Sequence, residues 1–192
     1  MHLVVHQCFG QSPLRLILVV ILLNLSSSAL ATPRVVVSLK PIHSLVAGLM
    51  QGVAEPKLLL DDNQSPHNLS LKPSQIRMLS QADLIIWIGA TLEPALSHLL
   101  QPNRYKAEVL SLLETPELLL LPVRDRKVWH SHGHASHQHE QPPESTGSTD
   151  QMDNHIWLSP ENAARMVRHL TQRLIKLDGS NRSRYIARVG WT

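Results

Sequence analysis

"PSQIRMLSQADLIIWIGATLEPALSHLL", residues 73–100, carries a helix, a strand and a second helix in one continuous run. Pro73 opens the first of these helices, and proline is well tolerated in a first helical turn. Residues 83–89 are nearly all apolar, as expected for a strand that is covered on both faces. The second helix is expected over residues 92–100. A doubly covered strand between two helices predicts a parallel sheet with crossover helices.

The same alternation of strand and helix extends in both directions from this stretch. Short strands are expected at residues 34–39, 57–60 and 107–112, and a further helix at residues 41–53. The helical spacing of three apolar residues predicts the buried face of that helix: Leu45, Leu49 and Val53. Because strand and helix alternate three times, the fold class is α/β, with a parallel sheet and crossover helices.

The alternation stops in the middle of the chain and then resumes. Residues 122–152 are polar and rich in histidine and proline, which predicts a long flexible loop. Ser159 is expected to cap the helix that follows, with Pro160 at its first position. One apolar stripe is expected on this helix: Ala163, Met166, Val167, Leu170, Leu174 and Leu177. The chain thus divides into an α/β lobe at residues 32–121, the loop, the completion of the lobe at residues 153–178, and a further element at residues 179–192.

The first 31 residues form a separate segment. Residues 14–25 are largely apolar and are followed by "SSSALA", which predicts a secretory signal peptide cleaved after Ala31 and export to the periplasm. An uncleaved membrane anchor is the alternative, although the apolar run is short for a bilayer span. The only cysteine, Cys8, lies in this segment, so a metal bound by the mature chain would need nitrogen and oxygen ligands.

Charge argues against a nucleic-acid partner. The formal net charge is +3, and the lysines and arginines are scattered rather than gathered into a basic block with aromatic residues.

Two histidines fall where an open parallel sheet binds its ligands, in loops at the carboxyl ends of strands. His67 precedes the helix that Pro73 opens, and His155 precedes the helix that Ser159 caps. Imidazole nitrogen suits zinc, so the pair are candidate zinc ligands. The alternatives stay open at this point: His67 as a surface loop residue, and His155 as a hydrogen-bonding partner of backbone carbonyls.

The other histidines have weaker claims. Five lie in the flexible loop: His130, His132, His134, His137 and His139. A flexible tract loses entropy when it closes around an ion, so it is expected to be an accessory zinc site or a solvated spacer. His43, His98 and His169 are expected to be packing or surface residues, and so are the tryptophans Trp87 and Trp157.

Four segments, in order, carry a family resemblance: "VVVSLKPIHSLVAGL", "SPHNLSLKPSQIRMLSQADLIIWIGATLEPAL", the histidine-rich loop and "DNHIWLSPENA". Together they resemble the zinc-specific solute-binding proteins of ABC importers, the ZnuA-type family within the metal-binding cluster A-I proteins. The resemblance implies two α/β lobes joined by a long helix, with the metal in the cleft between them. It carries the first-lobe ligands over to His67 and His155. Some members have an acidic residue before the first of these histidines, where this chain has Pro66.

The resemblance also implies what the chain would contain and do. The remaining ligands, a histidine and a carboxylate, belong to the second lobe. The chain is therefore expected to be an N-terminal lobe truncated before that lobe, with residues 179–192 starting the connecting helix. The expected function is to capture Zn²⁺, in preference to Mn²⁺, and to deliver it to the membrane permease of an ABC importer. Contact with the membrane would come only through that partner.

Two other functions are weighed against this one. A periplasmic zinc buffer would work through the histidine-rich tract. A secreted zinc hydrolase would need three protein ligands and usually a carboxylate base, and the sequence has no H-E-x-x-H motif. Asp153 and Glu161 are the carboxylates considered near His155 in the sequence. A binding protein, not an enzyme, is therefore the expected class.

Overall fold

The computed structural model describes residues 32–60, 64–67, 70–123 and 152–190. They contain a sheet of four parallel strands in the spatial order β2-β1-β3-β4. The strands are β1 (Val35–Val37), β2 (Lys57–Leu58), β3 (Leu84–Trp87) and β4 (Glu108–Ser111). Each lies inside a stretch where the sequence predicts one, and the α/β class with a parallel sheet is confirmed.

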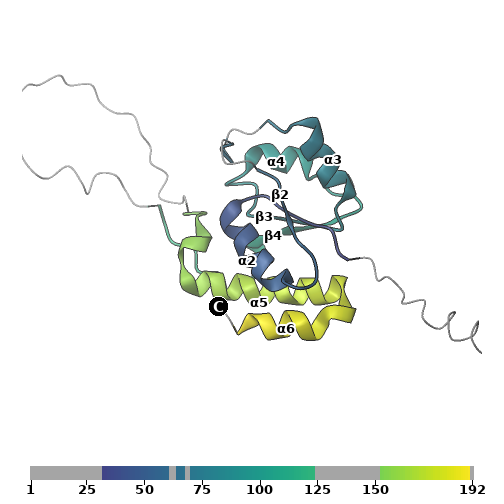
Figure 1. The fold of residues 1–192 in the computed structure, drawn as a ribbon. Helices are drawn as coiled ribbons and strands as arrows, with labels where there is room; N and C mark the ends of the chain where they lie inside the picture. Colours follow the sequence, from purple (N-terminus) through teal and green to yellow (C-terminus); the bar gives the residue numbers. More distant parts are fainter. Residues whose placement is uncertain (1–31, 61–63, 68–69, 124–151, 191–192) are drawn as a thin grey trace, which may run out of the picture. The chain divides into compact units, whose positions relative to one another are not determined.

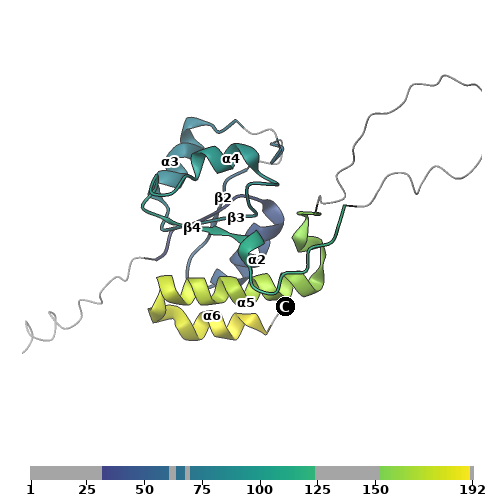
Figure 2. The ribbon, with the colours of Figure 1, turned by 180° about the vertical axis from the view of Figure 1, so that it is seen from behind.

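Within the described ranges, five α-helices accompany the sheet: α2 (Lys40–Met50), α3 (Pro73–Gln81), α4 (Pro94–Leu99), α5 (Pro160–Leu177) and α6 (Arg182–Val189). Figures 1 and 2 show α3 and α4 on one face of the sheet and α2, α5 and α6 on the other. The chain steps from β1 to β2 in one direction and from β3 to β4 in the opposite one. Because crossovers between parallel strands are right-handed, this reversal places α2 on the face opposite α3 and α4.

The core-facing side of α2 differs from the prediction. Its buried residues are Ile42, Val46, Leu49 and Met50. Leu45 is only half-buried, and Val53 lies beyond the end of the helix. The helix contacts β1 and β2 as well as α5 and α6, so it needs a broader apolar face than the one stripe that the spacing indicated.

Helix α5 begins as predicted. The Ser159 hydroxyl accepts a hydrogen bond from the Asn162 N–H at 3.3 Å, and Pro160 is the first helical residue. Four residues of the predicted apolar stripe are buried: Met166, Val167, Leu170 and Leu174. Ala163 is half-buried, and Leu177 in the last turn is 36% exposed. Arg173, late in the helix, pairs with Glu108 at the start of β4. Helix α5 therefore runs antiparallel to β4, and its amino end lies toward the carboxyl edge of the sheet.

The turn after β3 is closely packed. Gly89 has φ +148°, and a Cβ there would lie 2.8 Å from Leu113 Cδ1, so the position requires glycine. Glu93, which follows, is fully buried, and its Oε2 accepts a hydrogen bond from the Ile88 N–H at 2.7 Å. Burial raises the pKa of the Glu93 carboxyl, although the Ser38 hydroxyl and the amides of Ile88 and Gly89 partly offset that shift.

Replacing Glu93 by glutamine should stabilise the protein more at neutral pH than at acidic pH. Since the folded pKa of this carboxyl lies above its unfolded value, its contribution to stability is full below the unfolded pKa and is lost as pH rises through the folded one. Glutamine keeps the acceptor for Ile88 without a buried charge. Urea unfolding at a series of pH values measures the difference between variant and parent, with Glu55→Gln, on the surface, as the control. A Glu93→Gln benefit that shrinks between acidic and neutral pH would contradict the assignment.

Two expectations fall outside the described residues: the signal peptide at residues 1–31 and the tract from His130 to His139. In the part of the chain that the structure describes, no helix is long and apolar enough to cross a membrane.

Candidate metal site

His67 lies in the loop between β2 and α3, which leaves the sheet at its carboxyl edge. The Gln75 side chain, only 4% exposed, anchors this loop. Its amide nitrogen donates to the Leu59 carbonyl and to Gln64 Oε1, and its amide oxygen accepts from the Lys72 N–H at 2.8 Å. One buried amide therefore ties together three points of the loop that carries His67.

The His67 side chain itself is exposed. It belongs to a turn in which its N–H donates to the Ser65 hydroxyl at 3.3 Å. Pro66, at the position where some family members have an acidic residue, provides no ligand atom from its side chain. His67 is therefore open to an incoming ion from an anchored loop.

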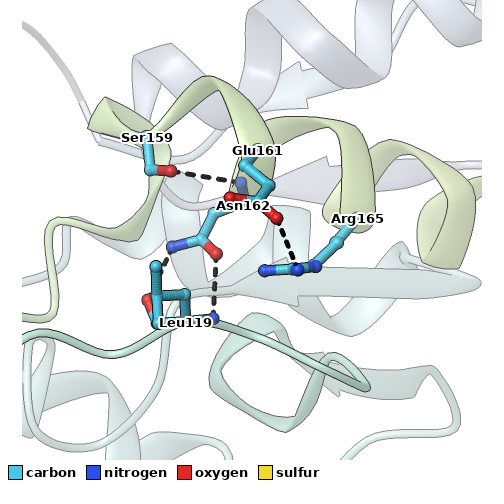
Figure 3. Close-up of polar contacts among 5 residues, drawn as sticks. All are labelled: Leu119, Ser159, Glu161, Asn162 and Arg165. Atoms are coloured by element: carbon cyan, nitrogen blue, oxygen red, sulfur yellow. Dashed lines mark hydrogen bonds and ion pairs between the residues drawn. The ribbon is translucent and has the colours of Figure 1, made fainter.

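His155 lies just before α5, at the N-terminal cap of the short 3-10 helix Ile156–Leu158. The Asp153 N–H donates to the Leu121 carbonyl at 2.8 Å, which ties this segment to the chain that follows β4. Asn162, in the first turn of α5, makes a second tie: its amide nitrogen donates to the Leu119 carbonyl at 2.8 Å, and its amide oxygen accepts from the Leu119 N–H at 2.9 Å. Figure 3 shows the Asn162 amide facing Leu119 while Glu161 pairs with Arg165 on the neighbouring turn.

The two histidine loops share a local design that sequence reasoning missed. In each, a proline opens the following helix, and the residue two positions later turns a buried amide back onto the loop: Gln75 after Pro73, and Asn162 after Pro160. The signal is present in the sequence as "LKPSQ" and "LSPEN". An amide has both donors and acceptors, so it can satisfy backbone groups of either kind in a loop that has no ladder partner.

Asn162→Ala should lower the free energy of unfolding by about 2 kcal/mol, because it leaves the N–H and the carbonyl of Leu119 without their partners. Urea denaturation measures the loss. Gln172→Ala, on the exposed side of the same helix, is the control and should change stability by less than about 0.5 kcal/mol. Equal effects for the two variants would show that the Asn162 tie does not hold in solution.

The immediate surroundings of His155 are an acidic and an aromatic side chain. Its ring Nδ1 lies 2.6 Å from Asp153 Oδ1, and its ring meets that of Trp157 edge to face, with 5.3 Å between centroids. The His155 backbone N–H and, next, its imidazole lower the pKa of Asp153. The carboxyl is therefore ionised at neutral pH and acts as an acceptor.

An open hollow on the surface contains His155 and the start of α5. It is lined by Leu119, Leu121, Asp153, His155, Ile156, Leu158, Ser159 and Asn162. His67 is not among the lining residues. Across the described ranges, no three histidine, cysteine, aspartate or glutamate side chains gather closely enough to hold an ion. The described residues thus offer two imidazoles from separate loops and no completed coordination shell.

A second hollow lies at the opposite, amino edge of the sheet. Its lining includes Arg34, Lys57 and Met78 but no histidine. Glu55 is the only carboxylate that lines it, and one carboxylate beside two cationic side chains does not make this hollow a candidate for the metal site.

The three other histidines in the described ranges lie outside the two histidine loops. His43 Nε2 lies 2.9 Å from the Pro56 carbonyl oxygen, and His98 is exposed on α4. His169 is half-buried on α5, where burial and the charge of Arg173 lower its pKa. Trp87 belongs to the core, as expected, whereas Trp157 is half-buried against His155.

Large exposed apolar side chains are concentrated in two segments, residues 119–123 and residues 152–158, and the second of these contains His155. Among the described residues, five of the seven large exposed hydrophobics are found there: Leu119, Leu121, Val123, Met152 and Leu158. Leu158 is 72% exposed, the highest value of the group. Contiguous exposed apolar patches mark contact surfaces for protein, membrane or ligand.

Fold and loops together define the class: a parallel α/β lobe whose carboxyl-edge loops present imidazole donors. The family model described as "Zinc-uptake complex component A periplasmic" matches residues 35–190, and the chain belongs to that family.

Curated relatives agree with this assignment. The chain is similar to the high-affinity zinc uptake system protein ZnuA of Yersinia pestis, with 32% identity over 163 residues, 83% of this chain and 51% of the relative. Similarity to the protein of the same name from Brucella abortus is 31% over 179 residues, 82% of this chain and 54% of the relative. The chain therefore spans about half the length of the curated relatives it matches.

Solved structures share the fold. The Zn(II)-bound ZnuA-like domain of Streptococcus pneumoniae AdcA matches with a TM-score of 0.61 and 18% identity, over 83% of this chain and 50% of that one. A Mn-bound periplasmic metal binding protein from Candidatus Liberibacter asiaticus matches with a TM-score of 0.62 and 16% identity, over 82% and 50%. At these identities the likeness is one of fold.

Proposed function

We propose that the chain binds Zn²⁺ in the periplasm through His67 and His155, as the capturing part of a zinc importer. Family membership is the observation that carries this proposal, since it joins the chain to zinc-uptake components over residues 35–190. The anchored loops at the carboxyl edge of the sheet expose these two imidazole side chains to solvent. The partner that receives the ion is the membrane permease of an ABC transporter. The chain works as a carrier and catalyses no reaction.

The coordination chemistry sets an expectation for the ligand shell. Zinc prefers four ligands in a tetrahedron. His67 and His155 supply two, and the family resemblance assigns the others to a second lobe. The chain spans about half the length of the curated relatives it matches. With two protein ligands, a polypeptide of these 192 residues is expected to complete the shell with water or further side chains.

Calorimetric titration of the full chain with zinc, and then with manganese, tests this function. The expected result is one saturable zinc site of highest affinity, with weaker ions at the tract from His130 to His139 and weaker binding of manganese. Several equivalent weak zinc ions and no distinct first site would favour a zinc buffer instead. Zinc-dependent hydrolysis of a generic ester would favour the hydrolase. Absence of any saturable binding would refute the proposal.

A further inference from the structure

The Asp153 and Trp157 side chains both contact the ring of His155. The contacts with Asp153 constrain which ring nitrogen carries the proton. The carboxylate Oδ1 of Asp153 lies 2.6 Å from the ring Nδ1. The same oxygen accepts the His155 backbone N–H at 2.9 Å. An aspartate that binds the backbone N–H two residues on forms an Asx turn, a local arrangement that fixes the side chain. The hydrogen bond to the backbone therefore orients the Asp153 carboxylate independently of its contact with the imidazole ring.

The backbone that carries this turn is also fixed. The Asp153 N–H donates to the Leu121 carbonyl at 2.8 Å, and the ring of Trp157 packs edge to face against the imidazole at an interplanar angle of 67°. Together these contacts limit rotation of the His155 ring about its side-chain bonds. The orientation in which Nδ1 faces Asp153 is the one that the surroundings support.

The chemistry of the pair then decides which ring nitrogen carries the proton. An ionised carboxylate has no proton to donate, so the short contact requires Nδ1–H as the donor. In a neutral imidazole the other nitrogen, Nε2, is then an acceptor with a free lone pair. Free imidazole side chains favour the opposite tautomer, with the proton on Nε2, which blocks that nitrogen as a ligand until the proton leaves or moves.

We propose that Asp153 is a positioning residue for the metal site: its carboxylate holds His155 in the Nδ1–H tautomer and so keeps Nε2 ready to take up the ion. This inference rests on the proposed zinc-binding function for its purpose but not for its geometry. Carboxylate partners of metal-binding histidines fix both the tautomer and the ring orientation, and losing one typically costs 10–100-fold in metal affinity. Asp153 therefore raises the affinity of His155 for zinc without binding the ion itself.

The test compares Asp153→Ala and Asp153→Asn with the parent chain in two independent measurements. The first is the tautomer of His155 in the metal-free protein, read from long-range ¹H–¹⁵N correlation spectra at about pH 8, where unperturbed imidazole is neutral. His155→Gln identifies the signals of this ring by their disappearance. The second measurement is zinc affinity by calorimetry. Glu161→Gln removes a negative charge from the first turn of α5 without touching either histidine, and serves as the charge control.

The expected results separate positioning from a general effect of charge. In the parent chain His155 carries its proton on Nδ1. In Asp153→Ala the proton moves to Nε2, and zinc affinity falls by about 10–100-fold. Asparagine still offers an acceptor oxygen, so Asp153→Asn should keep the Nδ1–H tautomer and lose less affinity than the alanine variant. Glu161→Gln should leave the tautomer unchanged and the affinity nearly so.

Three results would overturn the inference: an Nε2–H tautomer in the parent chain, an unchanged tautomer in Asp153→Ala, or a changed tautomer with unchanged zinc affinity. A failure of the proposed zinc-binding function would give a different combination of results. If the parent chain binds no zinc at its first site while Asp153 still controls the tautomer, the positioning geometry is correct and the assigned purpose is wrong. Melting temperatures of all variants show whether any loss of affinity comes from unfolding.

Discussion

His155→Ala and His67→Ala should each remove most of the specific zinc binding of the chain. Each substitution deletes a direct ligand, so the loss of affinity should exceed the roughly 10–100-fold that follows removal of an outer-shell partner. The double variant should retain only the weak ions of the histidine-rich tract. Both side chains are exposed, so neither change should unfold the protein. Calorimetric titration of the variants beside the parent chain measures the loss.

His98→Ala is the matched control for these variants. His98 is also an exposed histidine, but it lies on α4, outside both carboxyl-edge histidine loops. Its removal lowers the histidine count by the same amount and should leave the first zinc site intact. If His67→Ala binds zinc as tightly as His98→Ala does, His67 is not a ligand.

Tyr185→Ala should be the most destabilising of the substitutions considered, at about 3–5 kcal/mol, the range for deleting a large buried aromatic ring. Tyr185 is fully buried where α6 packs on α5 and α2, and its hydroxyl donates to Asp178 Oδ2 at 2.9 Å. Burial and the Asp178 carboxylate raise the pKa of the phenol, so it stays protonated and remains a donor. Urea unfolding at neutral pH measures the loss.

Tyr185→Phe separates the ring from its hydroxyl. It removes only the hydrogen bond to a charged acceptor and should cost about 2 kcal/mol. Ile186→Ala, the neighbouring position with a side chain that is 50% exposed, should cost little. A loss below about 1 kcal/mol for Tyr185→Ala would be far short of the range for a buried aromatic and would show that α6 does not pack against α5 and α2 in solution.

The helices and strands of this fold could be predicted from the sequence because its local patterns agree with one another. The apolar run of β3 lies between two proline-initiated helices, a pattern that favours a strand inside a parallel sheet with crossover helices. The buried side of α2 could not be predicted from spacing alone. Which of its residues are buried depends on α5, more than a hundred residues further along the chain, which packs against α2.

The candidate site was predictable in part. The positions of His67 and His155 follow from the rule that ligands bind at the carboxyl ends of parallel strands. The anchors of their loops, Gln75 and Asn162, were missed because a polar residue in a first helical turn is usually exposed. Their burial becomes visible only when the loop folds back over the helix start. The Asp153–His155 contact depends on an Asx turn that the letters D-N-H permit but do not require.

The most direct measurement of zinc coordination is the ring ¹⁵N spectrum of all histidines during titration of the full chain with zinc. We expect the Nε2 signal of His155 and a ring nitrogen signal of His67 to shift together within the first molar equivalent, before any signal from His130 to His139 moves. That order would show that the two anchored loops form the site of highest affinity. Shifts that begin in the tract, with His67 and His155 unchanged at saturation, would contradict zinc binding by the lobe.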